Sequence, residues 1–304
     1  MKRIAAALVI LAIAVAAVFF WLTAPNPLPV DILAGMDEGD AMAGERIFNA
    51  GGCNSCHGGK DPAADTLPML GGGLALKTPF GTFHAPNISP DPDTGIGKWS
   101  GADFANAMMR GVSPSGQHYY PAFPFTSYAR MKPGDVADLW AYIKTLPAVA
   151  RANVPHELSF PFSVRRGLGL WKLLYLSPDP VVAIDETDEK LVRGRYLVEG
   201  PGHCGECHTP RSLIGGLDKA RWLGGGPAPE GDGKIPNITP DASGIGSWSA
   251  EDIAYSMESG FTPEFDSLGG SMADVQRNIA RLTAEDRQAI AAYLKAAPPV
   301  ASSR

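Results

Sequence analysis

The chain has 304 residues, of which 45% are hydrophobic, and a formal net charge of −6. This length is enough for two domains that each bury a core, and the apolar content excludes a globally disordered protein. No run of Lys or Arg stands out, which excludes a nucleic-acid partner, because phosphate binding needs a concentrated basic surface. No segment alternates apolar and polar residues over a sustained length, so we expect helices joined by long loops rather than extended sheet.

The N-terminal residues predict a membrane anchor. Lys2 and Arg3 precede the uncharged segment 4–22, which is close to the ~20 residues that a helix needs to cross a bilayer. A cleaved signal peptide is the alternative, but the apolar run is long for that role and Pro25 follows the best cleavage position. We therefore expect residues 1–24 to be a single uncleaved anchor in a bacterial inner membrane, with the rest of the chain in the periplasm.

Two runs of the pattern Cys-x-x-Cys-His use every cysteine in the chain. They comprise Cys53, Cys56 and His57 in CNSCH, and Cys204, Cys207 and His208 in CGECH. This spacing is the attachment signature of c-type haem: the two sulfurs form thioethers with the porphyrin, and the adjacent imidazole becomes the proximal ligand of the iron. Two disulfides, a thioredoxin-like redox pair and a zinc site are the alternatives. The immediate His, the missing βαβ context and the repetition of the run all favour haem.

The repetition extends well beyond these motifs and indicates a duplicated domain of about 110 residues. Three pairs of segments occur in the same order in both halves: 44–57 with 194–208, 85–111 with 235–260, and 134–149 with 285–300. We therefore predict a first domain at 31–150, a linker at 151–184 and a second domain at 185–300.

Each copy is predicted to contain three helices, which makes the exported part all-α. In the first copy a helix over 39–50 ends just before the motif. Ser100 with Asp103, and Ser249 with Asp252, form the capping-box pattern that begins a second helix. The last helices carry apolar side chains at helical spacing over 136–146 and, after the cap Thr283, over 285–296.

These segments resemble a tandem of class I cytochrome c domains, over about residues 40–298. The two CxxCH runs, the PNI-S/T-P…GIG-x-W-S segments, YYPAFPFTSYARM (119–131) and GGSM (269–272) carry the resemblance. The chain is similar in particular to the cytochrome subunits of periplasmic alcohol, gluconate or sorbitol dehydrogenases. Those subunits commonly carry three haem domains, whereas this chain has two haem-attachment motifs. The resemblance implies two covalently bound haem c groups.

The sixth ligand of each iron is predicted to be a methionine, because a thioether raises the potential and closes the site. In the second copy we expect Met272 rather than Met257, since similar cytochromes take their ligand from this loop and Met257 has core spacing. In the first copy Phe123 occupies the nearest repeat position and cannot ligate iron. We expect Met131 there instead, with His118 and Met108 as the remaining candidates.

Three further features of the sequence need interpretation. Asn87 and Asn237, in the PNI segments, have two interpretations that can hold together: they donate to haem propionates, or they build a compact loop. The apolar segment 167–176 in the linker is expected to pack between the domains rather than lie on the membrane, because its charges are few. His118 and His156 are most simply satisfied or solvent-facing side chains.

The sequence favours electron relay as the function. Electrons would pass from a periplasmic dehydrogenase or quinone-linked donor through the two haems to a terminal oxidase or soluble cytochrome. No nucleotide fingerprint, phosphate loop or second metal cluster indicates substrate chemistry, so the chain is expected to be an electron-transfer protein or subunit and not itself an enzyme. The alternative is a dihaem enzyme such as a cytochrome c peroxidase or thiosulfate dehydrogenase; a variant with a cysteine ligand is excluded because no cysteine is left over. A haem-based sensor is a weaker third interpretation.

Overall fold

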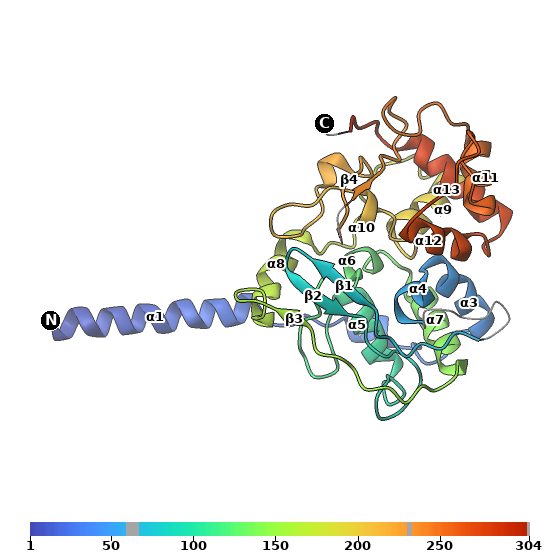
Figure 1. Ribbon diagram of the computed structural model, residues 1–304. Coiled ribbons are helices and arrows are strands. Elements are labelled where there is room, and N and C mark those ends of the chain that lie inside the picture. The colour runs from blue at the N-terminus through green and yellow to red at the C-terminus, as the bar shows by residue number, and fades with distance from the viewer. Residues whose placement is uncertain (59–66, 230–232, 303–304) are drawn as a thin grey trace.

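The computed structural model describes residues 1–58, 67–229 and 233–302, and shows one long helix projecting from a body built of two halves (Figure 1). This helix, α1 (Lys2–Leu22), has a mean hydropathy of 2.8 over its most apolar window, and none of its residues is buried. By length and composition α1 could cross a membrane.

The first half holds one hydrophobic core and follows the predicted helix order. Its elements are α2 (Val30–Leu33), α3 (Ala41–Ala50), α4 (Cys53–His57), β1 (Ala75–Thr78), β2 (Gly81–His84), α5 (Gly101–Arg110), α6 (Phe125–Tyr128) and α7 (Pro133–Thr145). The two largest fully buried side chains of this core are Trp140 of α7 and Phe48 of α3.

The second half repeats this arrangement around its own core. Its elements are α9 (Glu189–Glu199), α10 (Gly205–His208), η2 (Lys219–Arg221), β4 (Gly226–Pro227), β5 (Lys234–Ile235), α11 (Ala250–Ser259), α12 (Ser271–Ile279) and α13 (Ala284–Ala296). Tyr293 and Leu197 are among its largest fully buried side chains, and Ala50 at the end of α3 also packs into this cluster. The two clusters agree with the predicted duplication, and the exact domain boundaries stay a prediction.

One helix crossing is built in the same way in both halves. In the first half Gly44 of α3 lies against α7, so that a Cβ at Gly44 would be 2.0 Å from the Asp138 carbonyl oxygen. In the second half a Cβ at Gly194 of α9 would be 2.0 Å from the Ala289 carbonyl oxygen on α13. The missing side chain therefore allows the first and last helix of each half to pack backbone against backbone, directly beside the segment that leads into each motif.

The predicted helix starts are confirmed. Ser100 and Asp103 form a complete capping box at the start of α5, and Ser249 and Asp252 form one at the start of α11. Thr283 accepts a hydrogen bond from the Asp286 amide at the start of α13. These bonds satisfy backbone donors that a helix N-terminus leaves without partners.

The all-α prediction was wrong for the loops that follow the motifs. β1 and β2 form an antiparallel hairpin, and β3 (Glu157–Leu158) from the linker adds a third strand. The hairpin turns at Gly81, whose φ of +126° strongly favours glycine, and Thr78 accepts a bond from the Phe80 amide. β4 and β5 form a two-stranded counterpart in the second half. Strands of two to four residues are too short to give a period-two pattern.

The linker contains η1 (Arg165–Gly167) and α8 (Leu168–Tyr175), and α8 contacts both halves. Trp171 of α8 packs edge-on against Phe125 of the first half and donates to the Ile214 carbonyl oxygen of the second half at 2.9 Å. Tyr175 bonds Ser212 of the second half at 2.9 Å. One face of α8 therefore packs between the halves as expected, whereas Leu173 and Leu174 on another face are exposed.

Candidate functional site

Each Cys-x-x-Cys-His run lies on a short helix that directly follows the first long helix of its half. α4 holds the first run, and α10 holds the second with Cys204 as its N-cap. In both runs the first cysteine (Cys53, Cys204) is half-buried while the second (Cys56, Cys207) is exposed. Gly52 before α4 has a φ of +55°, a left-handed backbone that turns the chain sharply from α3 into the motif. The local fold therefore presents the two sulfurs of each run at different depths along one turn.

Both motif histidines are oriented by the same backbone contact. Nδ1 of His57 lies 2.8 Å from the Pro86 carbonyl oxygen, and Nδ1 of His208 lies 2.9 Å from the Pro236 carbonyl oxygen. A carbonyl accepts only, so Nδ1 carries the proton and Nε2 keeps its lone pair. Burial lowers the pKa of both imidazoles, which favours the neutral, metal-ligating form. The residues present therefore fit haem c: two thiols and a neutral, oriented imidazole in each run.

A glycine loop covers each motif from the other side. The Gly72 amide donates to the His57 carbonyl oxygen at 2.8 Å, and the Gly225 amide donates to the His208 carbonyl oxygen at the same distance. Both glycines have φ near +70°, and a Cβ on either would lie within 2.6 Å of the backbone of the PNI segment. Only glycine allows the backbones of the motif, the glycine loop and the PNI segment to approach so closely.

The PNI asparagines build the loops around these contacts. Asn87 donates to the Val149 carbonyl oxygen at 2.7 Å and to that of Arg151 at 3.1 Å, and Asn237 donates to the Val300 carbonyl oxygen at 2.6 Å. The side-chain oxygen of each accepts from the amide two residues later. Each asparagine thus fastens the segment after the last helix to the proline loop that orients the histidine, which supports the loop-building interpretation over a bond to a propionate.

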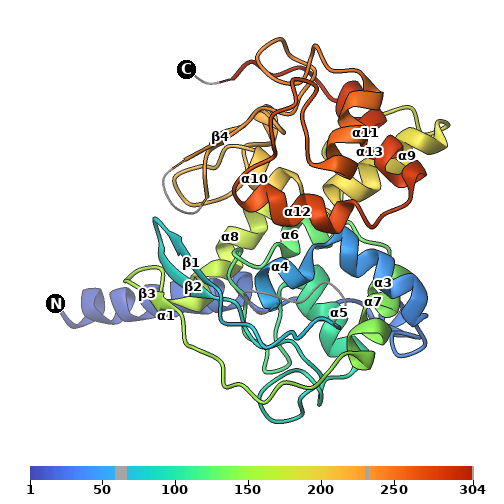
Figure 2. The ribbon, with the colours of Figure 1, turned by 45° about the vertical axis from the view of Figure 1, so that its right-hand side comes forward.

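The two motifs abut across the boundary between the halves. Nε2 of His203, the residue before Cys204, lies 3.1 Å from the Gly51 carbonyl oxygen, two residues before Cys53. The residues between the cysteines make matching contacts: Ser55 bonds Asn278 of α12 at 2.9 Å, and Glu206 bonds Thr126 of α6 at 2.6 Å. Each motif is therefore held by a helix of the opposite half, and both views show α4 and α10 on the inner sides of the halves (Figures 1 and 2).

Glu206 is a buried carboxylate inside the second motif, and its role was not predicted from the sequence. It accepts bonds from the hydroxyls of Thr126 and Ser127, and pairs with Arg211 at 2.7 Å. Burial alone would raise the pKa of Glu206, but Arg211 and the hydroxyl bond hold that pKa below its ordinary value. The middle positions of a Cys-x-x-Cys-His run accept any residue, so only the tertiary partners show this role.

A second buried carboxylate joins the halves nearby. Glu199 of α9 accepts bonds from the Val181 and Val182 amides and from Tyr293, and its carboxylate lies 3.9 Å from Arg130 of the first half. Tyr293 in turn accepts a bond from the indole of Trp222, which packs against Gly205 of the motif. This network connects the second motif to the interface through fixed polar groups.

The predicted axial methionines occupy different structural positions. Tyr119 and Leu268 make equivalent backbone bonds to the glycines that end α5 and α11. Four residues after them come Phe123 and Met272, which are therefore equivalent; Met272 is half-buried at the start of α12.

Met131 lies immediately before the N-cap of α7, where the second half has Leu282 before the N-cap of α13. Both side chains are buried, and Met131 belongs to the cluster against which Cys53 packs. Its equivalence to a core leucine competes with a role as iron ligand, so the assignment of Met131 stays a prediction.

The remaining candidate ligands have other contacts. Met108 and Met257 are buried in the two cores, as their spacing indicates. His118 is buried with its Nε2 2.9 Å from the Thr23 carbonyl oxygen and its Nδ1 3.1 Å from Lys172. Both ring nitrogens of His118 are thus used, which agrees with its interpretation as a satisfied side chain.

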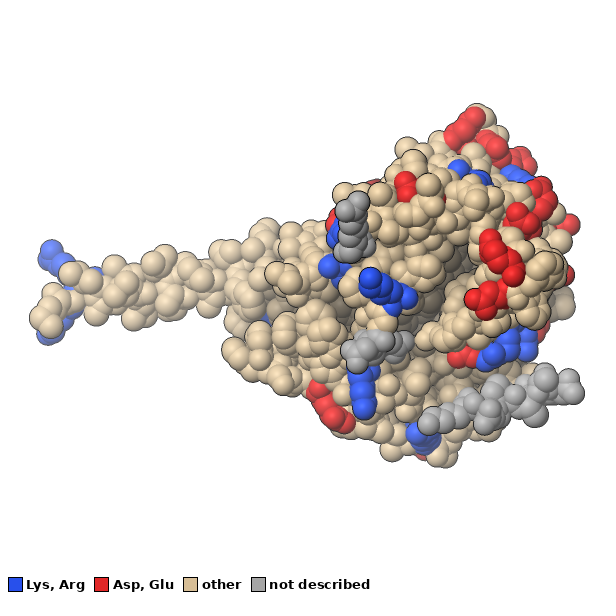
Figure 3. Space-filling view, turned by 45° about the horizontal axis from the view of Figure 1, so that its top comes forward, with Lys and Arg blue, Asp and Glu red and all other residues tan. Residues whose placement is uncertain are grey.

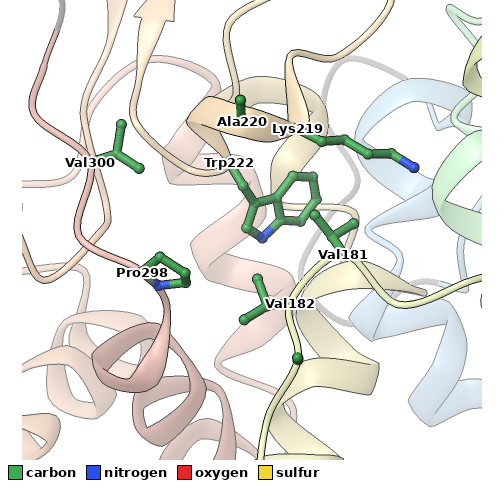
Figure 4. Close-up of a pocket in the computed structure, with 8 residues that line it drawn as sticks. Val181, Val182, Lys219, Ala220, Trp222, Pro298 and Val300 are labelled. Atoms are coloured by element: carbon green, nitrogen blue, oxygen red, sulfur yellow. The ribbon is translucent and has the colours of Figure 1, made fainter.

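A cavity of about 250 Å³ in the second half lies beside this site without including the motif. Figure 4 shows the Trp222 ring in the middle of its lining, with Pro298 and Val300 on one side and Val181 on the other. Its described lining residues include no cysteine and no histidine.

Comparisons with known proteins agree with this geometry. Residues 41–147 match the cytochrome c family. The chain is 54% identical over 300 residues to a protein named "Diheme cytochrome c-type" from Cereibacter sphaeroides, with 99% of this chain and 100% of that relative covered. The chain therefore belongs to the dihaem c-type cytochromes, and it carries two covalently bound haem c groups.

Other relatives are named as cytochrome subunits of dehydrogenases. The chain is 36% identical over 277 residues to the cytochrome c subunit of alcohol dehydrogenase (quinone) from Gluconacetobacter polyoxogenes, with 88% of this chain and 58% of the relative covered. It is 37% identical over 278 residues to the gluconate 2-dehydrogenase cytochrome c subunit of Pantoea cypripedii, with 86% and 61% covered. The chain thus spans about three fifths of these longer subunits.

Proposed function

We propose that this protein is a cytochrome tethered to the bacterial inner membrane, with both haem domains in the periplasm, that relays electrons. The donor is a periplasmic dehydrogenase or a quinone-linked enzyme, and the acceptor is a terminal oxidase or a soluble cytochrome. The dehydrogenase subunits among its relatives support this assignment. In this proposal both halves are class I cytochrome c domains, although the family match covers only the first.

The contact between the two motifs is the observation that carries the proposal. Gly51 and His203 join the segments leading into the two runs, and Ser55 and Glu206 hold each run against the opposite half. These contacts support two attachment sites that lie next to one another. A relay needs this fixed, short separation, whereas two independent carriers would not.

Each residue of the site has a defined task in this relay. The haem supplies one-electron chemistry when bound. The four cysteines would hold it covalently, His57 and His208 would each ligate one iron, and Met272 and Met131 are proposed as the further ligands. Pro86 and Pro236 hold the imidazole tautomer, which sets the basicity of the ligand. The buried carboxylate of Glu206 and its arginine partner are already in place before an electron arrives, so little reorganisation is needed.

A dihaem peroxidase or thiosulfate dehydrogenase is the alternative function. It needs an iron with an exchangeable ligand, and the equivalence of Phe123 to Met272 is the observation that would favour it in the first half. Adding hydrogen peroxide or thiosulfate to the purified protein should give no turnover at enzyme-like rates. Sustained turnover would show that the protein is an enzyme and would contradict the proposed relay.

Isolation from native membranes under mild detergent tests the relay most simply. We expect a partner oxidoreductase to copurify, identifiable by mass, and the haems of the complex to be reduced when its substrate is added. A chain that comes without any partner, yet is reduced quickly by a small soluble cytochrome, would contradict the dehydrogenase-linked version.

A further inference from the structure

The base of α1 is fastened to the body and does not hang from a free tether. Thr23, at the end of α1, is completely buried; its carbonyl oxygen accepts from His118 and its hydroxyl accepts from Arg166 at 2.8 Å. Arg166 also donates to the Phe20 carbonyl oxygen at 2.5 Å and lies over the Phe20 ring. Gly169 of α8 packs directly on Thr23, where a Cβ would lie 2.5 Å from its Cα. The orientation of α1 therefore fixes the orientation of the body.

Exposed apolar side chains gather around this base. We call them the collar, and its main members are Phe160, Phe162, Leu173, Leu174, Leu213 and Ile214. Leu213 is 98% exposed, Phe160 83% and Leu174 70%. Patches of such side chains on one surface mark an interaction site, whereas single exposed ones do not.

Contacts on the described residues link the segments that carry the collar. α8 follows η1, whose Arg166 holds α1, and its Trp171 bonds the Ile214 carbonyl oxygen. The neighbouring Gly215 lies against the ring of Phe80, where a Cβ would be 3.1 Å away, and Phe80 packs edge-on against Phe162 at 5.0 Å. The linker, the second half and the β1–β2 hairpin thus meet in one surface beside α1.

The charges around the collar suit a lipid surface. No Asp or Glu occurs within 158–178 or 211–217. The cations within 158–178 are Arg165 and Arg166 at the helix base and the buried Lys172, and 211–217 contains Arg211. Figure 3 shows few charged side chains around the base of α1, while acidic ones gather on the side of the body away from it. Arginine at a helix base with apolar side chains beside it is typical of the headgroup region.

We propose that the collar rests in the outer leaflet of the bilayer that holds α1, so that the body lies against the membrane in one fixed orientation. The proposal rests on the proposed membrane tethering. Because His118, Arg166 and Gly169 fasten the base of α1 to the body beside the collar, a bilayer that surrounds α1 would meet these side chains. This revises the expectation for 167–176: one face of α8 packs between the halves and the other faces lipid.

Photolabelling from within the bilayer tests this directly. The full haem-containing chain would be reconstituted in phosphatidylcholine–phosphatidylglycerol vesicles containing a lipid with a diazirine near the glycerol end of one acyl chain, and labelled peptides mapped by mass spectrometry. We expect label in α1 and in peptides covering 158–176 and 211–217. Label in α1 with none in the collar overturns the proposal. Label in neither overturns the membrane tethering itself.

A double variant sharpens the experiment. Replacing Leu173 and Leu174 by Gln should abolish labelling of α8 and leave that of α1 unchanged, whereas Met42→Gln, an exposed apolar side chain of α3 on the far side of the body, should change neither. Covalent haem content checks that each variant folds. A collar that stays unlabelled in vesicles but becomes protected from a water-soluble label in a purified dehydrogenase complex would assign the surface to a protein partner and refute a lipid contact.

Discussion

At the residue scale the site depends on a few buried polar groups that keep fixed partners. The histidines are oriented by proline carbonyl oxygens, and the carboxylate of Glu206 is held by Thr126, Ser127 and Arg211. Buried charges with such partners are costly to disturb, because removing one member leaves the other desolvated and unpaired.

Glu206→Gln should destabilise the protein at neutral pH by about 2 kcal/mol, since hydrogen bonds to a charged group are lost. The pKa of Glu206 is below its ordinary value when folded, so its contribution is present above about pH 4.5 and is lost as the pH falls through the lower folded pKa. Urea unfolding from pH 3 to 7 should therefore show that the free energy of unfolding falls less toward acid pH in the variant than in the unsubstituted protein.

The control is Asp93→Asn, which removes an exposed carboxylate paired with the exposed Lys98. Exposed pairs contribute roughly 0–1 kcal/mol. An equal effect of the two substitutions would show that Glu206 is not the buried, stabilising charge described above.

The axial ligands can be separated from core side chains by replacing each methionine with leucine, which keeps the volume and removes the sulfur. We expect Met272→Leu and Met131→Leu each to abolish the Met-to-iron charge-transfer absorption of one haem and to lower its potential. If Met131→Leu leaves both haems spectrally unchanged, Met131 is only the structural counterpart of Leu282.

At the element scale each half depends on a helix pair that glycine brings together. In both halves the first helix meets the last through a glycine facing a carbonyl oxygen, at Gly44 and at Gly194. These contacts position the short motif helix that follows, so packing and haem attachment are coupled through the same segment.

Gly44→Ala and Gly194→Ala should each lower the free energy of unfolding by about 2–3 kcal/mol or more, because the added methyl group forces the helices apart. Gly134→Ala is the control: it lies in α7 with open space around it, and alanine should add about 0.5 kcal/mol of helix stability. Urea titration of the three haem-containing variants measures this, and a Gly44→Ala variant as stable as Gly134→Ala would refute the close crossing.

Some of these elements could be predicted from the sequence and others could not. Helix starts and the motifs were predictable, because Ser100, Ser249 and Thr283 cap through bonds to residues three positions away, and Cys-x-x-Cys-His is local. The β1–β2 hairpin was missed because its strands are too short for periodicity. Glu206 was missed because Thr126 and Ser127 lie 79–80 residues away in the chain, and the exposed face of α8 depends on where α1 ends.

At the scale of the whole molecule, two separate cores share one interface in which the motifs meet. Arg130 and Glu199, and Tyr196 and Asp135, link the halves beside the motif contacts. The halves should therefore mature independently while holding their haems in a fixed relation.

Replacing Cys53 or Cys56 by Ala should prevent proper haem attachment in the first half and leave the second half loaded. Haem-stained denaturing gels should show half the signal per chain, with Cys204→Ala as the reciprocal control. Complete loss of haem from a substitution in one half would show that the two halves fold as one unit.

The proposed relay requires that electrons pass between the two haems within one molecule. Pulsed one-electron reduction of the oxidised protein, followed at wavelengths that distinguish the haems, measures this step. We expect a first-order redistribution whose rate is independent of protein concentration and which disappears when Cys53 is replaced by Ala. A redistribution whose rate rises in proportion to protein concentration would mean that electrons pass between molecules, and would contradict the relay.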